Sequence, residues 1–187
     1  MTVNDGTGHD GTGPGGRTGG RIVVGVDDSA GARAAVAFGL REAARRGARV
    51  EAVVSFLIPP YWPGPYGLPA AVPPTPLDDI RAMACDVATR VVDEVRAGLA
   101  GELAPMPEVA VRAIGGHPAV VLVDLADGAD MLVVGSRGHG AAVGMLIGSV
   151  SLHCVLHARC PVTIVHPHGE PADLREAAAR AASPVEH

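Results

Sequence analysis

The stretch GSRGHGAAVGMLIGS, residues 135–149, follows the apolar run MLVV of residues 131–134. A short apolar run bounded by turn residues is typical of a strand that is buried on both faces of a parallel sheet. Glycine allows the backbone to turn tightly or to approach another group closely, and at the start of a helix that group is often an anion. The stretch therefore predicts a buried strand, a loop that wraps a phosphate chain, and a helix that begins near Ser149.

Strands and helices are predicted to alternate along the rest of the chain. Short apolar or alternating runs indicate strands at residues 21–26, 49–56, 108–114, 131–134 and 161–166. Capping residues and helical spacing indicate helices from Ser29 to about Arg46, from Asp78 to about Ala100, from Pro118 to Gly128 and from Ser149 to His157. Met83 lies on the apolar face of the second helix and is expected to fill the core. Five strands alternating with four helices predict an α/β fold with an open sheet.

One domain is expected over residues 21–167, with enough apolar content for a core. Residues 1–20 are rich in glycine and threonine and are expected to form a disordered N-terminal tail. Residues 168–187 are expected to be a flexible C-terminal tail or to form a short exposed helix. The proline-rich residues 58–76 predict a long surface loop, which is either a stiff connector or, given its aromatic residues, a flap over a ligand.

Composition excludes several classes of function. All 15 basic residues are arginine, so the chain lacks the lysine that a Walker-type phosphate loop or a Schiff base requires. The formal net charge of −5, and the absence of glutamine and of any asparagine besides Asn4, argue against nucleic-acid binding. Cys85, Cys154 and Cys160 form no CxxC pair and are expected to be free, buried or half-buried thiols. No stretch is long enough for a signal-peptide core or a membrane span, so we expect a cytoplasmic protein without membrane contact.

Residues suited to a nucleotide follow two of the predicted strands. In an open α/β sheet, ligands lie at the carboxyl ends of the strands, at the point where the winding order reverses. The first strand ends at Gly25-Val26-Asp27, and the fourth leads into Gly135-Ser136-Arg137-Gly138. If these two strands are neighbours in the sheet, their ends form one cleft.

The two strand ends suit different parts of a nucleotide. The helix that starts at Ser149 offers free N–H groups and a positive dipole end, and the hydroxyls of Ser149 and Ser151 add donors for phosphate. The Asp27 carboxylate repels phosphate but accepts hydrogen bonds from the hydroxyl or amino groups of a sugar or base. These residues predict a mononucleotide site, with the phosphate charge offset by Arg137, His139 and a magnesium ion.

The chain resembles the universal stress protein (UspA) family over about residues 20–166. The resemblance is carried by VDDSAGARAAVAFGLREA, residues 26–43, and by GSRGHGAAVGMLIGSVSLHCVLHARCPVTIV, residues 135–165. The ATP-binding subclass of that family is marked by glycine, two residues, glycine, nine residues, glycine and then serine or threonine. Gly135, Gly138, Gly148 and Ser149 match this pattern. The resemblance implies a Rossmann-like, adenine-nucleotide alpha-hydrolase-like fold, in which a mostly parallel sheet of strand order 3-2-1-4-5 carries helices on both faces.

The resemblance also implies a set of contacts with ATP. Asp27 would meet the adenosine, with Gly25 and Val26 lining that end, and the backbone of Ser55 would hydrogen-bond the adenine edge. The loop would follow the ribose and phosphates through Gly135, Ser136, Arg137, Gly138, His139 and Gly140. The helix start would hold the phosphates through Gly148, Ser149, Val150 and Ser151. A homodimer through the last strand, residues 162–165, is implied as well, and it would pair an otherwise open sheet edge.

The sequence favours a binding protein over an enzyme. His139 and His117 are the candidates to orient a water molecule for hydrolysis, and neither has the spacing of a base with an orienting partner. We therefore expect a nucleotide-dependent regulatory protein of the stress response with at most slow ATP hydrolysis. The alternative is a dimeric interaction module that lacks ATP turnover or selects AMP or cyclic AMP. His153 and His157 have a spacing that can hold a metal, but no glutamate lies between them as in an HExxH motif, and no metal site is expected.

Overall fold

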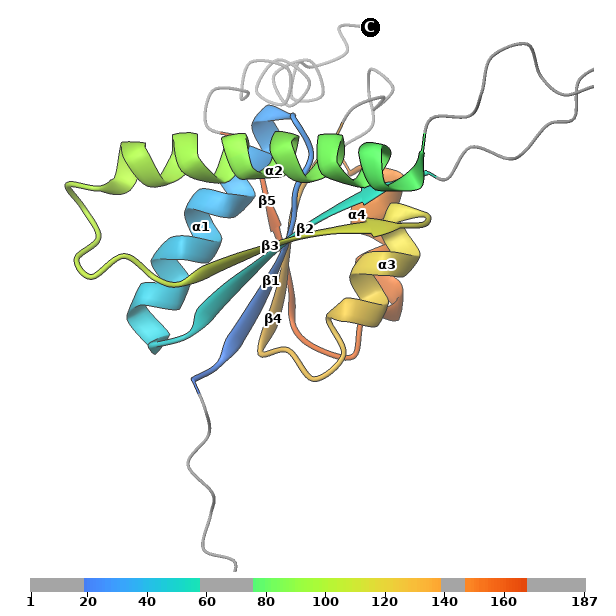
Figure 1. Cartoon of the computed structure of the whole chain (residues 1–187). Coiled ribbons are helices and arrows are strands. Elements are labelled where there is room, and N and C mark those ends of the chain that lie inside the picture. Colours follow the sequence, from blue (N-terminus) through green and yellow to red (C-terminus); the bar gives the residue numbers. More distant parts are fainter. Residues whose placement is uncertain (1–18, 58–75, 139–146, 168–187) are drawn as a thin grey trace, which may run out of the picture.

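Strand β1 (Arg21–Gly25) lies at the centre of a five-stranded parallel sheet with the order β3-β2-β1-β4-β5. The computed structural model, shown in Figure 1, describes residues 19–57, 76–138 and 147–167. The other strands are β2 (Arg49–Phe56), β3 (Val109–Gly115), β4 (Met131–Gly135) and β5 (Val162–Val165). The predicted strand order is confirmed, and β1 and β4 are neighbours, with Ile22 opposite Met131.

The sheet separates two apolar cores. Helices α1 (Ala30–Arg46) and α2 (Leu77–Leu99) cover one face, and α3 (Pro118–Leu125) and α4 (Ser149–His157) cover the other (Figure 1). Because successive side chains of a strand point to opposite faces, Ile22 and Val24 pack in the first core and Val23 packs in the second. The middle residues of β1 are fully buried, which explains why the strand is apolar throughout.

The sequence signals for helix ends act as predicted. The Ser29 hydroxyl accepts a hydrogen bond from the Ala32 N–H at the start of α1, and Gly47 ends that helix with a φ of 63°. Pro118 occupies the first turn of α3, but α3 ends at Leu125 rather than at Gly128. The other boundaries match the predicted ones or differ from them by one residue. None of the helices in the described ranges combines the length and apolar character needed to cross a membrane.

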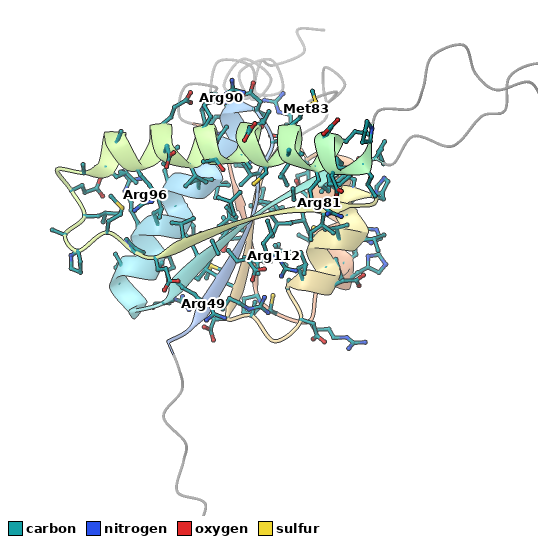
Figure 2. All side chains as sticks on the ribbon, viewed as in Figure 1. Arg49, Arg81, Met83, Arg90, Arg96 and Arg112 are labelled. Atoms are coloured by element: carbon teal, nitrogen blue, oxygen red, sulfur yellow. The ribbon has the colours of Figure 1, made fainter. Side chains whose placement is uncertain are left out.

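The expectation that Met83 fills the core is wrong. Met83 is 65% exposed, and in Figure 2 its side chain points away from the sheet. The buried residues of α2 all lie in its C-terminal part, at Ala88, Val91, Val92 and Leu99. The residue after Met83, Ala84, packs against the first core, so the sheet reaches this turn of α2. Successive residues of a helix are about 100° apart, which places Met83 to the side of the face that is buried.

Glycine contacts bring α1 onto the end of β4. A Cβ atom at Gly135 would lie 2.6 Å from the carbonyl carbon of Gly31, and one at Gly31 would lie 2.5 Å from the carbonyl oxygen of Arg137. Any side chain at either position would separate these backbones. The start of α1 consequently lies directly beside the loop that follows β4.

Candidate functional site

A cleft of about 260 Å³ lies at the carboxyl ends of β1 and β4. The prediction of a shared cleft is confirmed because these strands are adjacent and both contribute to its wall. Most of the predicted binding residues line it, namely Gly25, Val26, Asp27, Ser55, Gly135, Arg137, Gly138, Gly148, Ser149, Val150 and Ser151. His139 and Gly140 lie outside the described residues, as does most of the proline-rich loop.

Ser136 is placed behind the loop and does not line the cleft. It is fully buried, its N–H donates to the Val165 carbonyl at 2.8 Å, and its carbonyl accepts from the Gly148 N–H at 2.7 Å. Its hydroxyl has no hydrogen-bond partner in the part of the chain that the structure describes. The backbone of Ser136 therefore joins β5 to the start of α4, and a direct contact between its side chain and a ligand in the cleft is not supported.

Asp27 connects the two loops that border the cleft. One of its carboxylate oxygens accepts hydrogen bonds from the Ser29 N–H at 3.0 Å and from the Ser29 hydroxyl at 2.5 Å. The other oxygen would lie 2.5 Å from a Cβ atom at Gly138. Only a glycine at position 138 leaves room for the carboxylate in this orientation. Asp27 is thus fixed at the junction of the β1 and β4 ends, where it can accept hydrogen bonds from a ligand.

The N-terminus of α4 forms the polar end of the cleft. Its N-cap residue is Gly148, which has no side chain to cap the helix. The first N–H groups of a helix have no partner within the helix, so those of Ser149 and Val150 are available to an anion. The Ser151 hydroxyl, expected to donate to phosphate, instead donates to the Gly135 carbonyl at 2.6 Å. In this arrangement Ser151 fastens α4 to the end of β4.

The other end of the cleft is apolar, and sequence reasoning missed most of it. Gly25 pairs with Val53 there and lies against Leu122 and Val134. The other lining residues that were missed are Ser29, Ala32 and Pro118. Val53 precedes the predicted residue Ser55 by two positions, and alternate residues of a strand share a face. That periodicity could have found Val53. Leu122 comes from α3 and is brought to the cleft only by the tertiary fold.

The backbone of Ser55 faces the space beyond the end of β1. Val26 donates its N–H to the Val53 carbonyl at 2.8 Å, so the peptide groups of Val53 point toward β1. Two residues further along the strand, those of Ser55 point the same way. Strand β1 has already ended, and within the described residues no backbone hydrogen bond joins Ser55 to Val26. One N–H and one carbonyl are therefore presented side by side at the apolar end of the cleft.

The described cysteines and histidines outside the cleft form no cluster of three or more potential metal ligands. Burial raises the pKa of the Cys154 thiol to about 11, which keeps it protonated at neutral pH. Cys154 is buried and Cys85 and Cys160 are half-buried, so the prediction of free structural thiols is confirmed. The rings of His153 and His157 stack with centroids 4.1 Å apart. No group of three or more potential metal ligands occurs among the described residues.

Comparison with known proteins agrees with this arrangement. The sequence model of the Universal stress protein family matches residues 19–166. Universal stress protein Rv2623 of Mycobacterium tuberculosis (strain ATCC 25618 / H37Rv) is 34% identical over 167 residues, which cover 82% of this chain and 52% of that protein. The chain thus spans about half the length of this curated relative.

Two solved structures are similar in both sequence and fold. A universal stress protein in complex with cAMP is 26% identical with a TM-score of 0.54, covering 80% of this chain and 98% of that chain. The universal stress protein from Archaeoglobus fulgidus in complex with dAMP is 25% identical with a TM-score of 0.51, covering 78% and 96%. The fold is therefore that of these adenine-nucleotide complexes.

Proposed function

This chain belongs to the universal stress protein family, and on that premise we propose that it is a regulatory protein that binds ATP in the cleft between β1 and β4. The observation that carries the proposal is the polarity of the cleft. One end is apolar and presents the Ser55 backbone, and the other end is the uncapped N-terminus of α4. A nucleotide has the same division into an apolar base and an anionic tail.

The apolar end suits adenine. The base would lie between Val53, Leu122 and Val134, which supply apolar surface. The Ser55 carbonyl can accept from the exocyclic amino group, and its N–H can donate to the adjacent ring nitrogen. Guanine presents the opposite donor and acceptor on that edge, so the same backbone groups would discriminate against it. The Asp27 carboxylate is then positioned to accept from a ribose hydroxyl.

The polar end suits phosphate. The N–H groups at the start of α4 and the positive end of the helix dipole both favour an anion. Arg137 adds a positive charge to the described wall of the cleft. A magnesium ion is expected to accompany the phosphates, because Mg²⁺ is commonly held by one or two carboxylates together with phosphate oxygens.

Regulation rather than catalysis is supported by the residues around the phosphate end. Among the described residues that line the cleft, the charged side chains are Asp27 and Arg137, and Asp27 already accepts two hydrogen bonds from Ser29. General-base hydrolysis requires a base with an orienting partner close to the attacked phosphate. We expect ATP turnover to be slow or absent. A robust rate of phosphate release that His139→Ala abolishes would make the protein an enzyme.

The second candidate is a module that selects an adenine monophosphate. It is favoured by the cAMP and dAMP in the two similar structures, and the cleft offers no second cluster of phosphate ligands in its described part. Isothermal titration of ATP, AMP and cyclic AMP separates the two candidates. Tighter binding of ATP supports the first, and equal or tighter binding of a monophosphate supports the second.

A homodimer through β5 is part of the proposal. The Leu132 N–H donates to the Pro161 carbonyl, and the Ser136 N–H donates to the Val165 carbonyl. The peptide groups of Pro161, Thr163 and Val165 therefore point toward β4. The peptide groups of Val162 and Ile164 consequently point outward, and all four residues of β5 are partly exposed. An antiparallel β5 strand from a second copy would pair with this edge by two-fold symmetry.

Nucleotide carried through purification gives the direct test. The protein is denatured, and any released nucleotide is identified by mass spectrometry. In parallel, Gly148→Glu places bulk and negative charge at the helix start and is expected to abolish ATP binding. Gly98→Glu makes the same change on α2, where no atom lies within 4 Å, and is expected to bind normally. Unchanged affinity in a folded Gly148→Glu protein would refute the proposed site.

A further inference from the structure

Arg33 on the first turn of α1 bonds three acceptors in the loop that precedes the helix. Its Nη1 group donates to the carbonyl oxygens of Asp28 at 3.1 Å and of Ser29 at 3.3 Å. Its Nη2 group donates to the Asp28 carboxylate at 2.7 Å. The guanidinium group is planar and its donors point in fixed directions. Arg33 therefore restricts the backbone of the loop between β1 and α1 while these bonds are in place.

One of these bonds falls on a peptide group that also holds Asp27. The Asp28 carbonyl and the Ser29 N–H belong to the same peptide group, and this N–H donates to the Asp27 carboxylate at 3.0 Å. The C=O and N–H of a planar trans peptide group point in opposite directions. Arg33 thus bonds one side of the peptide group, and Asp27 bonds the other. A rotation that breaks the bond to Arg33 also turns the N–H away from Asp27.

The direction of the Asp27 carboxylate depends on this loop. The oxygen that accepts from the Ser29 N–H also accepts from the Ser29 hydroxyl at 2.5 Å. That hydroxyl in turn accepts from the Ala32 N–H at 3.1 Å, so Ser29 is tied to the first turn of α1. The other carboxylate oxygen lies close to Gly138. The carboxylate keeps this position in the cleft wall as long as the backbone of Ser29 keeps its own.

Arg33 also connects the loop to α2. Its Nε donates to the Glu94 carboxylate at 3.2 Å, and α1 and α2 lie on the same face of the sheet (Figure 1). Both side chains of this ion pair are partly exposed, and an exposed pair contributes little to stability. Its local effect is more specific, because a continuous series of hydrogen bonds runs from Glu94 through Arg33 and the peptide group to Asp27. Helix α2 itself contributes no residue to the described wall of the cleft.

We propose that Arg33 is a positioning residue that fixes the Asp27 carboxylate at the cleft, and that Glu94 of α2 holds Arg33 in place. The consequence for ligands rests on the proposed function, in which Asp27 accepts from a ribose hydroxyl. A carboxylate that is already ordered binds a hydroxyl more tightly than one that must be ordered on binding. Arg33 would thus raise the affinity for nucleotides that carry this hydroxyl without touching them.

Amide exchange in the nucleotide-free protein tests the geometry, with Arg41→Ala as the matched control. Arg41 also lies on α1 and donates to Glu102 at 2.6 and 2.7 Å, but it lines no part of the described cleft wall. Arg33→Ala is expected to speed exchange of the Ser29 amide, measured by NMR, at least about tenfold, whereas Arg41→Ala leaves it unchanged. Both variants introduce a good helix former and remove an exposed ion pair, so their urea midpoints should shift by similar small amounts. Exchange of the Ser29 amide that Arg33→Ala does not change would overturn the proposal.

Calorimetry with two nucleotides tests the consequence for binding. ATP carries both ribose hydroxyls and 2′,3′-dideoxy-ATP lacks them, whereas the base and phosphates are the same. Arg33→Ala is expected to weaken ATP binding about five- to tenfold and dideoxy-ATP binding by less than about twofold, and Arg41→Ala should change neither. An equal loss for both nucleotides in Arg33→Ala, or the same loss of ATP affinity in Arg41→Ala, would overturn the proposal. If the wild type binds neither nucleotide, the proposed function fails, and exchange of the Ser29 amide still decides whether Arg33 positions Asp27.

Discussion

Gly135→Ala provides a quantitative test of how α1 meets β4. A Cβ atom at position 135 would lie 2.6 Å from the carbonyl carbon, 2.9 Å from the carbonyl oxygen and 3.0 Å from the Cα of Gly31. All three are backbone atoms, so no side chain can rotate away and α1 itself must move. Overpacking of this kind costs about 1–3 kcal/mol, and we expect a value near the upper end. For a domain of this size, about 3 kcal/mol lowers the Tm by about 6–12 °C.

The assay is urea and thermal unfolding followed by circular dichroism. Gly31→Ala should give a similar loss, because its Cβ would lie 2.5 Å from the Arg137 carbonyl oxygen. Gly98→Ala is the matched control: no atom lies within 4 Å of its Cβ, and alanine in a helix should raise stability by up to about 1 kcal/mol. A Gly135→Ala protein that unfolds at the wild-type midpoint would refute the close contact.

Three further predictions follow from buried polar groups. Burial raises the pKa of Glu51, but hydrogen bonds from Arg21 and Arg112 outweigh this effect and lower the pKa overall. Glu51→Gln should therefore reduce the free energy of unfolding at pH 7 by about 1–3 kcal/mol. Because the folded-state pKa of Glu51 is depressed, the stability that its carboxylate contributes is present above the unfolded-state pKa and is lost as the pH falls through the folded-state pKa. The urea midpoints of wild type and Glu51→Gln should therefore converge in acid. A difference between the two midpoints that stays constant with pH would contradict this. Burial raises the pKa of Cys154 to about 11, so this thiol should be the last of the three to be alkylated by iodoacetamide at pH 8. Mass spectrometry gives the order of alkylation. If Cys154 reacts before Cys85 and Cys160, the assigned burial is wrong. Ser136→Ala removes a buried hydroxyl without a partner in the described chain, so the urea midpoint should stay level or rise; a loss above about 1 kcal/mol would reveal a missing partner.

Local signals in the sequence predicted the order of the elements along the chain and all but one of their boundaries to within one residue, the exception being the end of α3. β1 and β4 are apolar throughout because both faces are covered, and Gly47 ends α1 because its left-handed φ of 63° suits glycine. Met83 shows where this reasoning fails. Helical spacing identifies the apolar side of a helix, but it does not tell how wide a strip of that side the neighbouring layer covers. Ala84 packs against the first core, whereas Met83, about 100° further round the helix, stays exposed.

The candidate site was predictable where it depends on chain-adjacent residues. Asp27, Gly138 and Gly148 follow strands or precede a helix, and their positions at the cleft could be expected from the parallel topology. Leu122 and Ala32 lie on helices and reach the cleft only through packing, so no local pattern marks them. The Ser151 hydroxyl bonds the Gly135 carbonyl because the end of β4 lies within its reach, and that neighbour is invisible to residue type alone. A cytoplasmic location and a disordered N-terminal tail stay predictions of the sequence.

The pairing of β1 with β4 also has a consequence for biosynthesis. Arg21 at the start of β1 and Asp130 just before β4 are 109 positions apart in the chain, yet the Arg21 N–H donates to the Asp130 carboxylate at 2.7 Å. A ribosome must therefore have released more than a hundred residues after β1 before the central ladder can close. Until then the edge of β1 that later pairs with β4 has no partner strand, and chaperones can bind this edge. The cleft can thus form only after the chain has been synthesised at least as far as Ser151, because the start of α4 lines it.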